Sequence, residues 1–247
     1  RYAYVLRVDI EQHFAAIDHE ILLQMLTRRL PDASITWLLE KIVASGRDVL
    51  EQDYRMRWFP GDDLFAACRP RGLPIGNLTS QFWSNCYLDP FDHFVKRELG
   101  CRGYLRYVDD FAVCTDDKQQ LWRWKQALID RLVRYRLTIH ESACQVTPTR
   151  CGAPWLGFVI FPDHRKLKAR KARYATRRLA QRYAAWQGGT LSFADFDASV
   201  KGWVNHVRFA DTWGLRKTVF RRLATRQKNA RGALRAPTPL SRRISDQ

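Results

Sequence analysis

Apolar residues stand on both sides of a pair of acids near the middle of the chain. Residues 104–106 and 111–113 each have a strand-like pattern, and Asp109-Asp110 lie between them. Two such runs around a tight turn predict a β-hairpin that lifts two carboxylates above a sheet. Adjacent carboxylates repel each other unless a cation neutralises them, so the pair needs partners from elsewhere. Taken alone, it is also typical of an ordinary acidic turn.

The rest of the chain up to residue 160 mixes strand-like and helix-like patterns. Residues 2–10 form an apolar run that predicts a buried strand. Asp18 is expected to cap a helix that Pro31 ends. In a long helix over residues 78–98, we expect the inner face to carry Phe82, Cys86, Leu88, Phe91 and Val95. Further helices are expected around residues 35–43 and 116–135. Short strands are expected at residues 137–139, 145–147 and 155–160.

The composition changes at residue 165. Three helical segments follow, near residues 168–186, 193–208 and 213–227, and residues 165–235 hold 19 basic side chains against three acids. Residues 229–247 are rich in Pro, Ser and Arg and are expected to form a basic flexible tail. Mixed elements followed by helices alone predict an α+β body with a helical appendage.

Charge and composition narrow the class of protein. The 247 residues contain 42 Lys and Arg against 25 Asp and Glu, a net charge of +17 that favours a nucleic-acid partner. No apolar run approaches the roughly 20 residues of a membrane-spanning helix, and acids interrupt residues 1–25, which argues against a signal peptide. Six scattered cysteines without a CxxC pair predict free thiols, so we expect a cytoplasmic protein and no membrane partner.

Asp9 ends the opening strand and is the candidate partner for the two acids. If that strand lies beside the hairpin, Asp9, Asp109 and Asp110 meet at one edge and form an oxygen-rich site that suits Mg²⁺. Two such ions about 4 Å apart activate a 3′-hydroxyl and stabilise a leaving pyrophosphate, without a His or Ser nucleophile. A lone aspartate at a strand end is more often a cap or turn residue.

Two further stretches are candidates for contacts with a nucleotide. Phe14 follows Asp9 by five residues, and its ring could clash with a ribose 2′-hydroxyl or simply fill the core. In the stretch from Arg71 to Gln81, Gly76 lets the backbone approach a ligand, and Ser80 or Gln81 can offer hydrogen bonds. Read alone, that stretch is an ordinary junction between a loop and a helix.

These motifs resemble those of reverse transcriptases in order and spacing. They are Val8-Asp9-Ile10 through Phe14, Gly72 through Gln81, Tyr107-Val108-Asp109-Asp110 and Leu156-Gly157-Phe158. The resemblance covers residues 1 to about 225. It implies a right-hand polymerase palm, an antiparallel sheet with packed helices, at residues 1–164 with parts of the fingers. A helical thumb follows at residues 165–228, and most of the fingers lies outside this chain.

The resemblance also implies a role for each motif. The metal ligands are Asp9, Asp109, Asp110 and the carbonyl of Ile10, and they hold two Mg²⁺ ions for which Mn²⁺ can substitute. The implied nucleotide contacts are Phe14 as a steric gate, Ile75, Gly76, Ser80, Gln81 and Tyr107. The implied template and primer contacts are Arg71, the primer grip Leu156-Gly157-Phe158, and Arg170, Arg173 and Arg177. The three arginines are expected opposite the face that carries Ala172, Ala175, Leu179 and Tyr183.

The implied activity is RNA-directed DNA synthesis from an RNA template, a DNA or RNA primer and dNTPs. The Ile75-Gly76 and Ser80-Gln81 pairs resemble the error-prone enzymes of bacterial diversity-generating retroelements. There, an apolar residue at the position of Ile75 is linked to misincorporation opposite adenine, and a small basic helical protein acts as accessory. A group II intron, retron or phage-defence enzyme is the alternative branch.

Two departures from the family favour a different alternative, an impaired, maturase-like RNA-binding protein. Upstream fingers sequence is absent from these residues, and the chain opens directly on a core strand, so we expect further sequence before it. Ala143 stands where the family usually carries a lysine near the incoming phosphates. Lys118 or a thumb arginine is a candidate replacement.

Overall fold

The computed structural model describes residues 2–47 and 49–234, with side chains described as far as residue 225. It divides into two compact units, one of residues 1–153 and one that starts at residue 154. The division falls inside the first strand of a small sheet over residues 153–167, and the palm–thumb boundary expected at residue 164 stays a prediction. Each unit is described below by itself.

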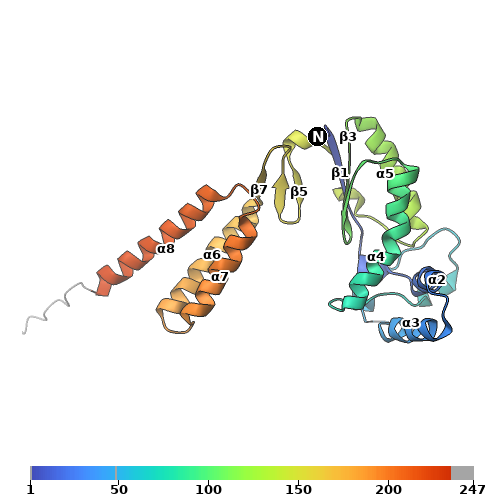
Figure 1. Ribbon diagram of the computed structural model, residues 1–247, viewed down its shortest axis with the longest axis horizontal. Helices are drawn as coiled ribbons and strands as arrows, with labels where there is room; N and C mark the ends of the chain where they lie inside the picture. Colours follow the sequence, from blue (N-terminus) through green and yellow to red (C-terminus); the bar gives the residue numbers. More distant parts are fainter. Residues whose placement is uncertain (1, 48, 235–247) are drawn as a thin grey trace, which may run out of the picture. The chain divides into compact units, whose positions relative to one another are not determined.

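The first unit is an antiparallel sheet with helices (Figure 1). Its strands run in the order β2-β3-β1-β4, and β1 pairs with both β3 and β4. The strands are β1 (Tyr4–Asp9), β2 (Gly103–Tyr107), β3 (Asp110–Thr115) and β4 (Val146–Pro148). The helices are α1 (His13–Ala16), α2 (His19–Arg29), α3 (Ala33–Ser45), α4 (Leu78–His93) and α5 (Lys118–Val133). A π-helical turn, Phe94–Glu98, continues α4. The expected α+β class is therefore confirmed.

The register of β1 against β3 separates a buried face from a polar one. Leu6 lies opposite Val113 and Val8 opposite Phe111, and all four are buried. Because side chains alternate along a strand, Asp9 and its partner Asp110 lie on the other face. The sheet thus turns its apolar side to the core and leaves the acids on the opposite side.

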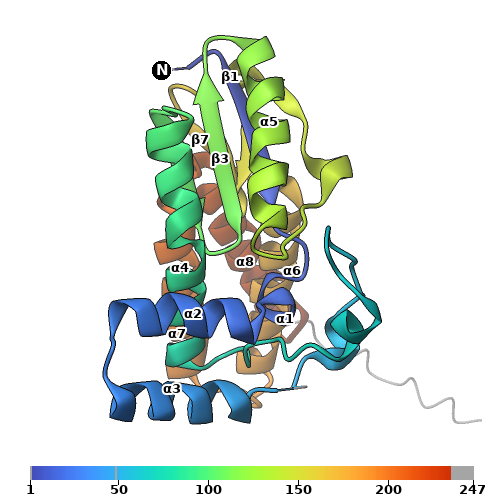
Figure 2. The same cartoon turned by 90° about the vertical axis from the view of Figure 1, so that its right-hand side faces the viewer.

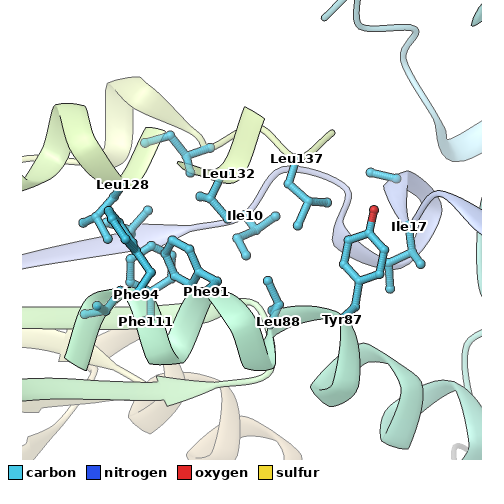
Figure 3. Packing of buried hydrophobic residues seen from close by; sticks show 14 of the residues in the cluster. Ile10, Ile17, Tyr87, Leu88, Phe91, Phe94, Phe111, Leu128, Leu132 and Leu137 are labelled. Atoms are coloured by element: carbon cyan, nitrogen blue, oxygen red, sulfur yellow. The ribbon is translucent and has the colours of Figure 1, made fainter. Parts of the chain in front are cut away.

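Helices α4 and α5 bury their apolar faces in this core. Phe91 of α4 packs edge to face on Phe111 of β3, with 5.2 Å between the ring centroids. Leu128 and Leu132 of α5 point into the same cluster, which Figure 3 shows together with Leu88, Phe94, Leu137 and Ile10. Figure 2 shows α4 and α5 running alongside β1 and β3, with α2 and α3 side by side. A continuous core of this kind fixes the sheet on which the acids stand.

Local capping explains where two of the expected helices begin. The Asp18 side chain accepts hydrogen bonds from the backbone N–H groups of Glu20 and Ile21 at the start of α2, as predicted. Asp117 accepts from Gln119 N at the start of α5. Asp18 also contacts the guanidinium groups of Arg136 at 2.7 Å and Arg69 at 3.7 Å, which connects three loops of the unit.

The predicted inner face of α4 is partly wrong. Leu88, Phe91 and Val95 are buried and Cys86 is half-buried, but Phe82 is 63% exposed. Ser80 and Ser84 are buried instead. Apolar residues lie on both sides of this helix, so their spacing alone cannot set which face turns inward.

Two expected strands differ in the structure. Residues 137–139 form no strand, because only one bridge, between Ile10 and Ile139, pairs them with the end of β1. The predicted strand 155–160 is two strands joined by a turn at Leu156-Gly157, where both residues have positive φ (44° and 89°). Glycine adopts a positive φ without strain, so Gly157 was the residue from which this turn could have been predicted.

The second unit starts with the sheet β5-β6-β7 and continues with three helices. The strands are β5 (Ala153–Trp155), β6 (Phe158–Ile160) and β7 (Arg165–Leu167), and the helices are α6 (Ala169–Gln187), α7 (Phe193–Val207) and α8 (Trp213–Leu234). Leu179, Tyr183, Phe196, Val219 and Leu223 form its core. All three helices were predicted, but α8 extends into the segment expected to be a tail from residue 229. The remainder of that segment, from residue 235, lies outside the described residues.

Across the residues that the structure describes, no helix combines the length and apolar character needed to cross a bilayer.

Candidate active site

Strands β1 and β3 bring Asp9 and Asp110 directly opposite each other on the polar face of the sheet. The Cβ atoms of residues paired in this way lie about 4.5–5.5 Å apart, a span that fits a site for two metal ions about 4 Å from each other. Asp109 occupies the turn that leads into β3, and its carbonyl oxygen accepts a hydrogen bond from Ile10 N at 3.2 Å. This bond fastens the hairpin tip to the end of β1.

The hairpin turn itself has an unusual backbone. Tyr107 pairs with Asp110, so Val108 and Asp109 form a two-residue turn, and Val108 has φ of 56°. Positive φ is unfavourable for a β-branched residue and requires support from its surroundings. Arg106 provides such support, because it donates a 2.9 Å hydrogen bond to the Val108 carbonyl and forms a 2.6 Å ion pair with Asp92 of α4.

The surroundings of Asp9 raise the pKa of its carboxyl group. Burial raises the pKa of its carboxyl group above 3.8, and the neighbouring carboxylates of Asp110 and Asp109 raise it further. His140 and Arg7 act in the opposite direction but are weaker. A raised pKa means that negative charge at this position is unfavourable without a compensating cation. The three aspartates of the sequence prediction therefore lie within electrostatic range of one another.

Arg7 is a member of this cluster that sequence reasoning missed. Its guanidinium contacts Asp110 Oδ1 at 2.6 Å, and the two side chains are 34% and 20% exposed. Within the described residues, no three His, Cys, Asp or Glu side chains are already arranged as a metal-binding group. Arg7 holds the Asp110 carboxylate through this ion pair. The carboxylate donors suit a hard divalent cation such as Mg²⁺. Arg7 stands two residues before Asp9, so strand alternation was the signal that places it on the same face.

Phe14 lies in the short helix α1, directly after β1. It packs against the main core and is only partly buried, so it is both a core aromatic and a surface group. Its carbonyl oxygen accepts a hydrogen bond from Leu73 N at 2.8 Å, and the Ile17 carbonyl accepts one from Gly72 N at 2.8 Å. These bonds place the start of the 72–81 motif beside Phe14.

The nucleotide candidates of this motif differ in accessibility. Ile75 is 70% exposed, and Gly76 has φ of 102° with open space where a Cβ would lie. Gln81 is exposed, as is Tyr107 at 58% on the hairpin. Ser80, expected to offer its hydroxyl to a ligand, is instead 1% exposed, because it lies on the inner face of α4.

Arg71 is already engaged within its own unit. Its guanidinium lies 4.1 Å from the centre of the Tyr54 ring and donates hydrogen bonds to the carbonyls of Ala67 and Arg69. The side chain is half-buried. To contact a template strand, Arg71 has to exchange these internal contacts for phosphate oxygens.

A basic side chain, Lys125, lies beside Ala143, the position at which the family usually carries a lysine. Ala143 lies exposed in the 3-10 turn Glu141–Ala143, and Lys118 lies exposed at the start of α5. Lys125 of α5, which sequence reasoning did not consider, donates a 3.2 Å hydrogen bond to the carbonyl of Cys144. An ammonium group therefore does lie next to this turn, supplied by a different element.

The second unit carries the remaining candidates. Leu156 and Gly157 form the β5–β6 turn, and Phe158 packs against His206 with ring centroids 5.2 Å apart. On α6, Leu179 and Tyr183 are buried and Ala172 and Ala175 half-buried, as predicted. Arg170, Arg173 and Arg177 are exposed on the other side of that helix.

Comparisons with known proteins place this chain in a family. Residues 1–160 match the model of the family "Reverse transcriptase (RNA-dependent DNA polymerase)". The chain therefore belongs to the reverse transcriptase family, and this part of the sequence prediction is confirmed. A comparison of the sequence with curated proteins gave no match.

Solved structures with a similar fold include telomerases. A telomerase from Candida albicans, in complex with a TWJ fragment of telomeric RNA, has a TM-score of 0.53 at 12% identity. The alignment covers 94% of this chain and 40% of that one, so this chain spans less than half the length of the telomerase. Apo telomerase from Candida tropicalis has a TM-score of 0.48 at 12% identity, covering 91% and 43% of the two chains. The first likeness supports the fold assignment.

Proposed function

We propose that this chain carries the polymerase centre of an RNA-directed DNA polymerase, which copies an RNA template into DNA from dNTPs. The observation that carries the proposal is the pairing of Asp9 with Asp110 on β1 and β3, with Asp109 fixed at the hairpin tip. This arrangement occurs in a chain whose residues 1–160 match the reverse transcriptase family. Nucleotidyl transfer depends mainly on positioning and charge compensation, and a carboxylate cluster supplies both.

The carboxylates of Asp9, Asp109 and Asp110 and the carbonyl of Ile10 would hold two Mg²⁺ ions, or Mn²⁺ in their place. When bound, the ions supply activation of the primer 3′-hydroxyl and neutralise charge on the leaving pyrophosphate. The chain's own residues prepare the site. Burial and the neighbouring carboxylates of Asp110 and Asp109 raise the pKa of Asp9, and Arg7, which forms an ion pair with Asp110, acts against this rise.

The surroundings of the acids define the proposed substrate contacts. Phe14 lies next to the 72–81 motif and acts as the steric gate against a ribose 2′-hydroxyl. Ile75, Gly76, Gln81 and Tyr107 are accessible for contacts with the nucleotide and its pairing base. Ser80 acts from inside α4, through the position of the helix rather than by direct contact. In the second unit, Leu156-Gly157-Phe158 forms the primer grip.

Basic side chains provide the proposed contacts with the template–primer duplex. Arg170, Arg173 and Arg177 are exposed along one side of α6 and can follow a phosphate backbone. Arg71 also contacts the template backbone once its guanidinium moves off the Tyr54 ring. The net charge of +17 supports a polyanionic partner.

Primer extension tests the proposal. With an RNA template, a DNA primer, dNTPs and Mg²⁺, the full-length protein should extend the primer, and Asp109→Asn should abolish extension. Asp130→Asn makes the same change of charge at an exposed residue of α5 that accepts a hydrogen bond from Gln126, and it should leave extension intact. Thermal unfolding checks that both variants fold. An Asp109→Asn variant that is as active as the wild type removes the metal-site assignment.

Ala143 supports a second candidate, an RNA-binding protein of the maturase type whose polymerase is impaired. The usual lysine is replaced there, and Lys125 reaches only the carbonyl next to it. This candidate gains support if the protein binds RNA tightly and incorporates no nucleotide with either Mg²⁺ or Mn²⁺.

For the branch, we propose a diversity-generating retroelement. Ile75 is 70% exposed and cannot hydrogen-bond a nucleotide, so correct pairing lacks one orienting contact. The Ile75→Gln variant should therefore copy template adenines more accurately than the wild type, as read by sequencing the products. Equal error spectra for the two proteins count against this branch and favour a group II intron, retron or phage-defence enzyme.

A further inference from the structure

A buried histidine lies directly behind the proposed steric gate. His13 precedes Phe14 in α1 and is only 2% exposed. Its Nε2 lies 2.7 Å from the hydroxyl oxygen of Ser84, which is itself fully buried on α4. The two side chains therefore join α1 to α4 through one buried hydrogen bond.

The position of His13 is not explained by core packing alone. Burying a polar ring is unfavourable unless its polar atoms are hydrogen-bonded, and an apolar ring of similar size fills such a space more easily. Only one ring nitrogen is satisfied, since Nδ1 has no hydrogen-bond partner among the described residues. The hydrogen bond to Ser84 is thus the polar contact that sets the orientation of the buried imidazole ring.

That role is not acid–base chemistry. Burial lowers the pKa of His13 to about 3, and the positive charge of Arg106 adds to the effect. The ring is therefore neutral at physiological pH. It neither supplies a charge to a triphosphate nor exchanges a proton during turnover, so its contribution is geometric.

The geometric contact of His13 is with Phe14. The two rings meet edge to face, with centroids 5.3 Å apart and an angle of 67° between the planes. This is a favourable aromatic arrangement that restricts both rings. The Phe14 backbone is held separately, because its carbonyl accepts the hydrogen bond from Leu73 N. Backbone and side chain of the gate residue are thus fixed by two different contacts.

We propose that His13 is a positioning residue for sugar selection, held by Ser84 so that its ring keeps the Phe14 ring in place against a ribose 2′-hydroxyl. The inference rests on the proposed function and on the gate role of Phe14. A steric gate excludes a hydroxyl only while its ring cannot rotate or shift away. Loss of the Ser84 contact frees the His13 ring, and with it the Phe14 ring, so a ribonucleotide gains access.

The test compares dATP with ATP on one primer–template, because the base and its pairing are then identical. The measured quantity is kcat/KM for dATP divided by kcat/KM for ATP. The loss of one edge-to-face ring contact corresponds to about three- to tenfold, so we expect Ser84→Ala, which frees the His13 ring without removing it, to lower this ratio by up to that amount. The change should come from faster use of ATP, with kcat/KM for dATP nearly unchanged. His13→Ala should lower the ratio at least as far.

A double-mutant cycle separates positioning from general damage. Phe14→Val should lower the ratio most, and adding Ser84→Ala to Phe14→Val should change it little further, because both act through one ring. Cys86→Ala is the matched control, since Cys86 is a half-buried side chain two residues further along α4. It should leave the ratio unaltered. Thermal unfolding checks each variant, and Ser84→Ala decides the question if His13→Ala does not fold.

Two failures are distinguishable. A wild-type protein that extends no primer overturns the proposed polymerase function, and the positioning role falls with it. An active wild type whose ratio is the same in Ser84→Ala, His13→Ala and Cys86→Ala overturns only the positioning role. The same holds if dATP and ATP use decline in parallel, because a purely structural effect leaves their ratio unchanged.

Discussion

Replacing Arg7 tests whether the candidate site is built for cations. Arg7 pairs with Asp110 at 2.6 Å and opposes the raised pKa of Asp9. Two unit charges about 5 Å apart interact by roughly 1 kcal/mol in water and roughly 3 kcal/mol at an effective dielectric of 20. Because the Arg7 side chain is 34% exposed, solvent screening places its contribution near the lower value. Arg7→Gln should therefore destabilise the metal-free protein by about 1 kcal/mol.

Mg²⁺ should offset this loss of stability, because the Arg7→Gln variant should bind the ion more tightly than the wild type does. Without Arg7, the Asp110 carboxylate loses its ion-pair partner, and an incoming cation no longer competes with Arg7 for it. By linkage, the same ~1 kcal/mol becomes about fivefold tighter Mg²⁺ binding in the variant. The variant should thus melt about 2–4 °C below the wild type in EDTA and approach it in saturating Mg²⁺.

Differential scanning calorimetry with and without Mg²⁺, together with isothermal titration of the ion, measures both quantities. Arg123→Gln is the control. Arg123 lies on α5 and pairs at 3.6 Å with Asp117, the cap of that helix, and this ion pair is more exposed than the Arg7–Asp110 pair. This variant should change neither melting nor Mg²⁺ affinity. The reasoning is refuted if Arg7→Gln loses the same stability in EDTA and in Mg²⁺, or if its affinity for Mg²⁺ is unaltered.

Three further predictions follow from the fold and the charges. Asp18→Ala should cost about 3 kcal/mol in urea unfolding, because it removes a helix cap and leaves Arg136 without its 2.7 Å partner; Asp18→Asn, which keeps the cap, should cost less. The raised pKa of Asp9 means that the folded state binds this proton more tightly, so its contribution to stability is present below pH 3.8 and lost as pH rises through the raised pKa. In EDTA, Asp9→Asn should accordingly gain stability over the wild type between about pH 4 and pH 7, and Mg²⁺ should narrow that gap. RNA binding should weaken steeply with salt, as filter binding at several KCl concentrations can measure, and a flat response would contradict the basic face of α6.

The parts of the site that sequence could predict are those set by local pattern. The hairpin around Asp109-Asp110, the strand that ends at Asp9 and the cap at Asp18 each have a signal within a few residues, and the structure has all three. Opposite pairing of Asp9 and Asp110 followed only from the assumption that the two strands are neighbours. The family motifs, rather than periodicity, supported that assumption.

Contacts between distant segments could not be predicted. The hydrogen bond between His13 and Ser84 joins residues 71 positions apart and depends on which face of α4 turns inward. That face was assigned wrongly at Phe82, and the same error placed the Ser80 hydroxyl at the surface. A one-residue difference in helical phase is enough to exchange a buried serine for an exposed one.

Helix α4 connects the two ends of the candidate site. It begins at Leu78, just after the exposed Ile75-Gly76, and its Asp92 holds Arg106, whose guanidinium supports the strained Val108 carbonyl. The support of the hairpin turn therefore comes from a helix that lies outside the aspartate cluster. Asp92→Ala should release Arg106 and loosen the turn before Asp109, and so lower the activity of the proposed polymerase without removing any of its three acids.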